Sequence, residues 1–508
     1  MLKRREDLMA FARREIEKAD KKTNKQDCGN IFMISAILAV SLLSGMFVML
    51  LDAGVGDADY YWHNKLGGYI VDNKSLMTQD TFSWLSIQNG YTEYAHSWLG
   101  SVLIYFLGCL GKLLFGRADY GAILVSGIGV CLTVGATYWF FIRRFKKETT
   151  RFLLLMATLC LCLISTNARP QAFSTPLFII LIGLLYRMKG WKDCLYIGII
   201  TILWANIHGG TVLIVPAFAG FFLILSAIPN FEFYSLSHTK KDNKTILNYG
   251  IALAACFAAS CLNPFGVKLY TYAFGTNSSS IKSYVAEWKP AALISPIVLI
   301  SILIIILTLL VAKKIRLSVF IILIGSMMLS AIRIRYSLYL GMFCVPAMCI
   351  TFEGSEFKKT FAMKKIMIYL CIVGALMFFN LQGHISTGDN RIVKNSNLPS
   401  KELVSEIKEK DYKRLYSSYD IGGYLIFNDI PSFVDSRADL FGADNIKDAI
   451  YFDHFTFETK DDFKEFLEKF DFDGILLSAK SPTSTYLADY GYKKVSEDEN
   501  FILFEKMY

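Results

Sequence analysis

The stretch AALISPIVLISILIIILTLLVA, at residues 291–312, is long, apolar and free of charged side chains. At about 1.5 Å per residue, a helix of this length crosses a hydrocarbon core of roughly 30 Å. Residues 31–51 form a second uncharged stretch of this kind. The chain as a whole is 54% hydrophobic and 14% aromatic, with a mean hydropathy of +0.39. These values exclude a soluble globular protein and indicate lipid as the main solvent.

Residues 1–30 are too long and too mixed in charge for the basic region of a signal peptide, so we expect residues 31–51 to remain as a first spanning helix. About eleven spanning helices are predicted in all. Their ranges are 31–51, 120–142, 151–167, 171–187, 193–208, 211–229, 247–262, 291–312, 316–331, 337–352 and 364–382.

One further apolar segment, residues 98–116, is interrupted by glycines and is expected to lie in the membrane interface instead of crossing. With that assignment all the strong basic clusters fall on one side, which the positive-inside rule makes cytoplasmic. The clusters lie in residues 1–25, 143–147, 187–189, 240–241, 313–316 and 358–365. The N-terminus is then cytoplasmic, and the chain is predicted to be a multi-pass protein of the cytoplasmic membrane.

Three parts follow from this topology: a basic cytoplasmic N-terminus (1–30), a transmembrane domain (31–382) with a large first outer loop (52–119), and a soluble extracytoplasmic domain (383–508). The last part holds 16 Lys and Arg against 24 Asp and Glu, and an acidic domain can be translocated. Its pattern predicts a small α/β fold. Strands are expected at 415–418, 424–428, 474–477 and 501–504, with a helix at 461–470.

The eleven cysteines lie mostly within apolar segments, and none follows Cys371. They include no CxxC pair and no metal-spaced cluster with histidine, so neither a disulfide framework nor a zinc site is predicted. Buried thiols behave as small apolar groups, and we interpret the cysteines as structural.

The first outer loop begins with GDADYYWH, which places Asp57, Asp59 and His63 close to the membrane exit. Ionisable groups at such a boundary often serve transport, ion pairing or catalysis. The alternative is that the two acids are solvated or cap a helix that starts near Tyr60. From the residues alone, both interpretations stand.

Further polar residues are predicted at the outer ends of other helices: Arg169, Asn206, His208, Arg333 and Arg335. An interfacial arginine is often only a headgroup anchor, and a lone histidine at a helix end is more often structural. Arg169, however, lies beside Pro170 between apolar runs, where its planar guanidinium suits bidentate binding of a phosphate. The common depth of all these groups favours one shared site.

The ordered motifs GDADYYWHNKLGGYI, TQDTFSWLS, YAHSWLG, ARPQ, LWANIHGG, NPFG and EWKP resemble bacterial GT-C membrane glycosyltransferases. The similarity runs from about residue 30 to the end, because DIGGYLIFND and FVDSRADLFG resemble the C-terminal domains of that group. The resemblance implies a GT-C-like helical membrane fold. It also implies a carboxylate of this loop as general base, Asp57 first and Asp59 next. The substrate-binding residues that it implies are His63, His96, Arg169, Gln171, Asn206, His208, Glu287, Arg333 and Arg335.

The activity implied by the resemblance is inverting transfer of a sugar from a polyprenyl-phosphate carrier to a glycan, lipid or protein acceptor outside the cytoplasm. Membrane lipids are expected partners and nucleic acid is not. No metal is assigned; a divalent ion could bind Asp57 and Asp59, but two carboxylates fall short of a full coordination shell. The alternatives are a lipid or polysaccharide transporter or flippase and a receptor-like protein. A transporter usually shows an internal repeat and midplane charges, and neither is seen in the sequence.

Overall fold

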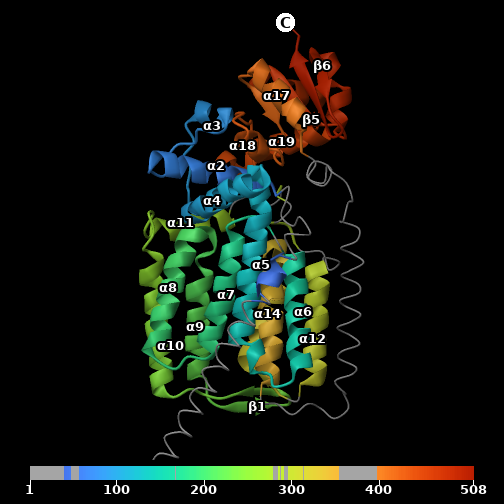
Figure 1. The fold of residues 1–508 in the computed structure, drawn as a ribbon. Coiled ribbons are helices and arrows are strands. Elements are labelled where there is room, and N and C mark those ends of the chain that lie inside the picture. The colour runs from blue at the N-terminus through green and yellow to red at the C-terminus, as the bar shows by residue number, and fades with distance from the viewer. Residues whose placement is uncertain are drawn as a thin grey trace, which may run out of the picture.

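The structure is a computed structural model that describes residues 39, 41–46, 57–165, 167–278, 284–285, 288–290, 296–312, 314–353 and 398–507. A bundle of long apolar helices forms its larger part (Figure 1). These helices are α5 (Gly121–Phe140), α6 (Glu148–Ile164), α7 (Gln171–Tyr186), α8 (Trp191–Ile207), α9 (Ile214–Ala227), α10 (Asn243–Ser260), α12 (Pro296–Val311), α13 (Leu317–Ile332) and α14 (Ser337–Phe352). Each lies in or near an apolar segment predicted from the sequence.

By length and composition, four described helical segments are apolar enough to cross a membrane: Trp98–Phe115, Ala118–Arg144, Gly209–Ala227 and Ile334–Phe352. Gln171–Tyr186, Ile297–Ile306 and Leu317–Ile332 are shorter apolar helices. A large buried core of aliphatic and aromatic side chains joins α5–α10 and α12–α14. The predicted segments at residues 31–51 and 364–382 lie largely or wholly outside the described residues.

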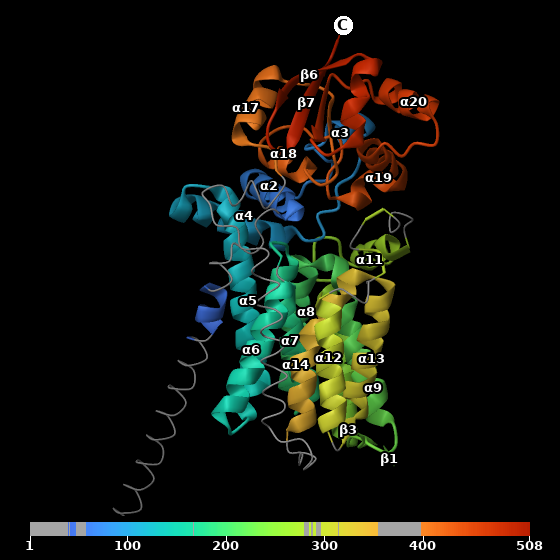
Figure 2. The same ribbon diagram turned by 90° about the vertical axis from the view of Figure 1, so that its right-hand side faces the viewer.

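Two helices of the segment predicted to be the first outer loop, α2 (Ala58–Asn73) and α4 (Trp98–Phe115), lie across one end of the bundle (Figures 1 and 2). Helix α4 is apolar enough to span, yet it runs roughly crosswise to α5 instead of beside it. One of its faces, with Gly100, Ile104 and Gly108, is buried, and α4 packs on α2. A helix with one apolar face covered and the other exposed fits the membrane interface.

At the opposite end of the bundle, three short strands form a small sheet in the order β1-β2-β3 (Figure 1). They are β1 (Phe231–Phe233), β2 (Leu236–His238) and β3 (Ile315–Arg316). Strands β1 and β2 are antiparallel, whereas β2 and β3 run parallel. The ends of two interhelical connections are therefore tied together, far from the outer-loop helices.

Residues 398–507 fold around a four-stranded mixed sheet of order β4-β5-β7-β6. Its strands are β4 (Leu415–Ser417), β5 (Gly474–Ser478), β6 (Tyr492–Glu497) and β7 (Phe501–Lys506). The helices are α17 (Lys401–Lys410), α18 (Gly422–Phe427), α19 (Ala438–His454) and α20 (Lys460–Phe470). This unit sits over the outer-loop helices at the end of the bundle (Figure 2).

The strand predicted at residues 424–428 is wrong, because Gly422–Phe427 is the short helix α18. Periodicity alone cannot separate a short apolar strand from a buried helical turn. Tertiary packing decides it: the rings of Tyr424 and Tyr61 meet edge to face at 5.0 Å, and α18 packs on α2. At Gly423 a β-carbon would lie 2.6 Å from the carbonyl oxygen of Ala58, so the two helices touch through the glycine backbone.

Candidate functional site

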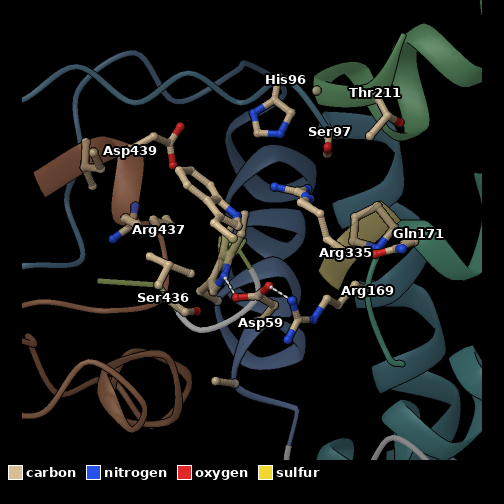
Figure 3. Close-up of a pocket in the computed structure, with 18 of the residues that line it drawn as sticks. Asp59, His96, Ser97, Arg169, Gln171, Thr211, Arg335, Ser436, Arg437 and Asp439 are labelled. Carbon is tan, nitrogen blue, oxygen red and sulfur yellow. Dashed lines mark hydrogen bonds and ion pairs between the residues drawn. The ribbon is translucent and has the colours of Figure 1, made fainter. Parts of the chain in front are cut away.

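A cavity of about 1110 Å³ lies between the ends of the bundle helices that adjoin α2 and α4, the predicted first outer loop and residues 419–454 of the C-terminal unit. Several turns and helix ends converge on it. Asp59 comes from the first turn of α2, and Arg169 precedes α7. His208 follows α8, while Arg333 and Arg335 lie between α13 and α14. Segments far apart in the chain thus share one cavity (Figure 3).

Arg169 joins the two acids of the first outer loop. Its Nε lies 2.8 and 3.0 Å from the two carboxylate oxygens of Asp57, and its Nη1 lies 2.9 Å from Asp59 Oδ2. The indole Nε1–H of Trp62 donates to Asp59 Oδ1 at 3.0 Å. A guanidinium held by two carboxylates in a partly dry site has a fixed orientation, so both acids are held in place.

Asp57 and Asp59 differ in their access to the cavity. Asp57 is the N-cap of α2, accepting from the backbone N–H of Asp59 at 3.1 Å, and it also accepts from the N–H of Ala168 at 3.1 Å. Its side chain is 8% exposed and is not among the residues that line the cavity. Asp59 does line it and is 18% exposed. Of the two predicted acids, Asp59 is the one a bound molecule can reach.

Four histidines line the cavity, and three of them, His63, His96 and His208, are kept neutral by their surroundings. Burial first, and then the electrostatic effect of Arg335, His96 and Arg169, lowers the pKa of His208 to about 3. Burial likewise lowers the pKa of His63 well below its ordinary value, and burial is also the main cause that lowers the pKa of His96. At neutral pH these rings therefore serve as hydrogen-bond partners and not as cations.

Each imidazole is also held in place. His63 Nδ1 lies 2.7 Å from Ser101 Oγ, and its ring stacks on Trp62. His208 Nδ1 lies 2.8 Å from Ser174 Oγ. His96 Nδ1 donates to the carbonyl of Tyr94 at 3.0 Å, and the ring stacks on Tyr272 with a centroid separation of 4.6 Å.

The α13–α14 turn supplies the cationic part of the cavity wall. The Arg335 guanidinium lies 5.6 Å from the centre of the Trp288 ring, and among the described residues it makes no ion pair. Arg333 is 8% exposed and lies near the Tyr336 ring. With Lys289, these residues give that wall positive charge. A positive, partly dry wall suits a phosphate group.

Of the remaining predicted residues, one lines the cavity, one does not, and one lies outside the described residues. Gln171, the first residue of α7, lines the cavity. Asn206 does not, because its side chain is used in packing: it accepts from Trp98 Nε1 at 2.8 Å and donates to the carbonyl of Leu262 at 2.9 Å. Glu287 lies outside the described residues.

The described residues contain no group of three or more His, Cys, Asp or Glu side chains arranged to hold a metal ion. The positive charge between Asp57 and Asp59 is that of Arg169. A bridging divalent ion would compete with this guanidinium for the same carboxylate oxygens.

A second group of residues was not predicted from the sequence: the C-terminal unit contributes Tyr419, Asp420, Ser436, Arg437, Asp439, Asp453 and His454 to the cavity. We name this set, without Arg437, the C-terminal wall. The motif FVDSRADLFG contains three of these seven residues, but nothing in its spacing shows that it faces the outer loop. That arrangement exists only in the folded chain.

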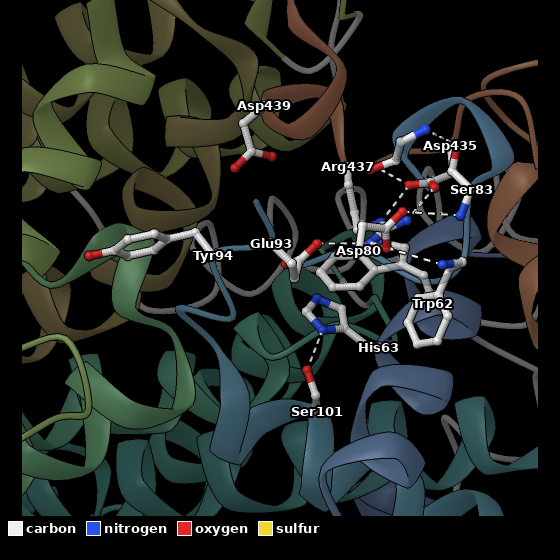
Figure 4. A network of polar contacts seen from close by, with 12 residues as sticks. Trp62, His63, Asp80, Ser83, Glu93, Tyr94, Ser101, Asp435, Arg437 and Asp439 are labelled. Carbon is white, nitrogen blue, oxygen red and sulfur yellow. Dashed lines mark hydrogen bonds and ion pairs between the residues drawn. The ribbon is translucent and has the colours of Figure 1, made fainter. Parts of the chain in front are cut away.

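Arg437 ties the C-terminal unit to the first outer loop (Figure 4). Its guanidinium lies 2.6 Å from Asp80, 2.8 Å from Glu93 and 2.8 Å from Asp435, and the four side chains are at most 8% exposed. Burial raises the pKa of Glu93 to about 7 against the opposing effect of Arg437. Three carboxylates around one buried cation make a site that stays stable only while the cation is present.

Comparisons with known proteins bear on the fold. No protein-family model and no curated protein matches the chain. The solved Archaeoglobus fulgidus oligosaccharyltransferase, tethered with an acceptor peptide that contains the NVT sequon, is similar with a TM-score of 0.51 and 12% identity over 89% of this chain and 70% of that chain. Its apo form gives 0.49 at the same identity and coverage. At this identity the likeness shows the fold alone, which is similar to that of the solved oligosaccharyltransferase.

Proposed function

We propose that this membrane protein is a glycosyltransferase that moves a sugar from a polyprenyl-phosphate carrier to an acceptor at the extracytoplasmic face. The observation that supports the proposal best is the cavity itself. It holds an accessible carboxylate, Asp59, together with the cationic residues Arg333, Arg335 and Lys289. It lies at the bundle end that α2 and α4 cross.

The donor lipid enters from the membrane, so its phosphate comes to rest near the α13–α14 turn. There Arg333 and Arg335 offset the negative charge that grows on the leaving phosphate as the bond to the sugar breaks. His208 and His63 remain neutral and can hydrogen-bond the sugar without repelling the arginines. A transporter would instead place such groups near the bilayer midplane.

Asp59 is the proposed proton acceptor. An acceptor hydroxyl attacks the anomeric carbon, the carbon–oxygen bond to phosphate breaks, and the hydroxyl proton passes to the Asp59 carboxylate. Arg169 and Trp62 hold this carboxylate in a fixed direction at the cavity wall. Asp57 is the positioning residue behind it, since it binds the same guanidinium from outside the cavity.

The test compares Asp59→Asn with Asp57→Asn in purified protein reconstituted in lipid nanodiscs. The substrates are polyprenyl-phosphate-linked hexoses, and released polyprenyl phosphate is measured by mass spectrometry. Loss of a general base lowers the rate about 10²- to 10⁴-fold, which is the result expected for Asp59→Asn. Asp57→Asn should cost about tenfold or less, the effect of roughly 1.4 kcal/mol of lost positioning.

A larger loss in Asp57→Asn than in Asp59→Asn would move the base to Asp57. Near-wild-type turnover in both variants would refute a loop carboxylate as base. If the wild-type protein releases no polyprenyl phosphate from any hexose donor, the proposed activity itself is refuted.

A further inference from the structure

The two walls of the cavity carry opposite charges. Arg333, Arg335 and Lys289 lie on the wall formed by the bundle, whereas Asp420, Asp439 and Asp453 lie on the C-terminal wall. The positive charge of Arg437, which also reaches the cavity, is already offset by the three carboxylates that surround it. The cavity therefore has a basic wall on the bundle side and an acidic wall on the side of the C-terminal unit.

Within the C-terminal wall, Asp420 is the carboxylate that has no partner among the described residues. Its side chain is exposed inside the cavity, and no described residue forms an ion pair or hydrogen bond with it. Burial by the surrounding protein raises the pKa of Asp420, His454 opposes this shift, and the negative charge of Asp59 adds to it. Asp59 and Asp420 therefore face the same space from two different parts of the chain.

The other two acids of this wall already have partners. Asp439 accepts a hydrogen bond from the hydroxyl of Tyr272 at 2.5 Å, and Asp453 accepts one from Tyr416 at 2.9 Å. In contrast, the Oγ of Ser436 is buried and has no hydrogen-bond partner among the described residues. Figure 3 shows Ser436 on the same side of the cavity as Arg437 and Asp439. A buried hydroxyl left without a partner costs free energy unless a ligand supplies one.

We propose, resting on the proposed transferase activity, that the C-terminal wall binds the acceptor, with Asp420 accepting a hydrogen bond from an acceptor hydroxyl opposite Asp59, and that the acceptor is an uncharged, hydroxyl-rich glycan. The charge pattern selects this class. An anionic acceptor is repelled by Asp420, Asp439 and Asp59. A cationic acceptor is attracted to these carboxylates, but it would form an ion pair with them, the proposed base Asp59 included, and is repelled by the arginines of the opposite wall. An uncharged polyol meets neither penalty.

Asp420 acts on the acceptor, whereas the arginines act on the donor. This division separates the inference from the proposed function in an experiment. Release of polyprenyl phosphate without any added acceptor reports donor cleavage by water. The further increase in release on adding an acceptor reports the C-terminal wall.

The probes are three trisaccharides of different charge: maltotriose, the trimer of glucosamine and the trimer of galacturonic acid. Each is added to wild-type protein, Asp420→Asn and the control Glu465→Gln, an exposed carboxylate on α20 outside the cavity. We expect maltotriose alone to accelerate release by the wild-type protein. In Asp420→Asn its KM should rise about 10- to 100-fold, the loss expected for a hydrogen bond to a charged group. Glu465→Gln should match the wild type.

Acceleration by the galacturonate or glucosamine trimer equal to that by maltotriose would overturn the uncharged class. An unchanged maltotriose KM in Asp420→Asn, or no response to any trimer while acceptor-free release continues, would overturn the acceptor assignment and leave the donor chemistry standing. Absence of release under every condition would refute the transferase and this inference together.

Discussion

Removing Arg437 should separate the C-terminal unit from the first outer loop. In Arg437→Met the carboxylates of Asp80, Asp435 and Glu93 keep their burial but lose the cation that lies 2.6 to 2.8 Å from each. Breaking a buried ion pair by deleting one partner costs about 3–5 kcal/mol. Glu93 can relieve part of this by taking up a proton, because its pKa is already about 7. We therefore expect the lower end of that range at pH 6 and the upper end at pH 8.

Amide hydrogen exchange measures the separation of the C-terminal unit from the first outer loop directly. The N–H of Trp84 donates to the carbonyl of Ser432, and the N–H of Ser432 donates to that of Phe82, so both amides are protected only while the two parts are docked. A cost of about 3 kcal/mol lowers their protection on the order of 100-fold. Amides in the centre of α7 should keep their protection, since the bundle does not depend on this contact.

The matched control is Arg414→Met. Arg414 pairs with Asp471 at 3.7 Å, and both side chains are about half exposed. Such surface pairs contribute about 0–1 kcal/mol, so the Trp84 and Ser432 amides should stay within roughly fivefold of wild type. If Arg437→Met also leaves them unchanged, the buried cluster does not hold the two parts together and the argument from burial fails.

Two further outcomes are expected. Because burial raises the folded-state pKa of Glu93 from 4.5 to about 7, the native protein binds more protons than the unfolded chain in that window. The contribution of Glu93 to stability should fall as pH rises from about 4.5 to 7, by at most on the order of 3 kcal/mol. Glu93→Gln should therefore make the thermal-unfolding midpoint depend less on pH over that range. A midpoint that falls with pH as steeply as in the wild type would contradict this. Gly422→Ala places a β-carbon 2.0 Å from the carbonyl oxygen of Val434 and should destabilise the C-terminal unit by about 1–3 kcal/mol or more. The control Gly250→Ala should be tolerated, because no described atom lies within 4 Å of the added β-carbon. Equal thermal-unfolding midpoints for the two variants would show that the backbone around Gly422 shifts to accept the methyl group.

The sequence alone was sufficient for the bundle. Long uncharged runs must be helical in lipid, because only a helix satisfies its own backbone hydrogen bonds there. For this reason the predicted ranges 171–187 and 316–331 nearly coincide with α7 and α13. The same logic placed the polar residues at the helix ends, where charge is tolerated, and Arg169, His208 and Arg335 do share one cavity. The distribution of basic residues predicted an interfacial helix at residues 98–116, and α4 does run crosswise to α5.

Tertiary structure alone decided which acid faces the cavity. Asp57 and Asp59 are two residues apart, but the first becomes the N-cap of α2 and turns to Ala168, while the second faces the cavity. The partners of Arg437, Asp80 and Glu93, are 357 and 344 residues away in the chain, and no local pattern encodes such a pairing. Asp420 likewise shares a cavity with Asp59 only because Gly423, near the start of α18, lets that helix approach α2. Hydrophobic periodicity determines which segments are buried in lipid, whereas the meeting of distant polar side chains depends on packing between segments that share no sequence neighbourhood.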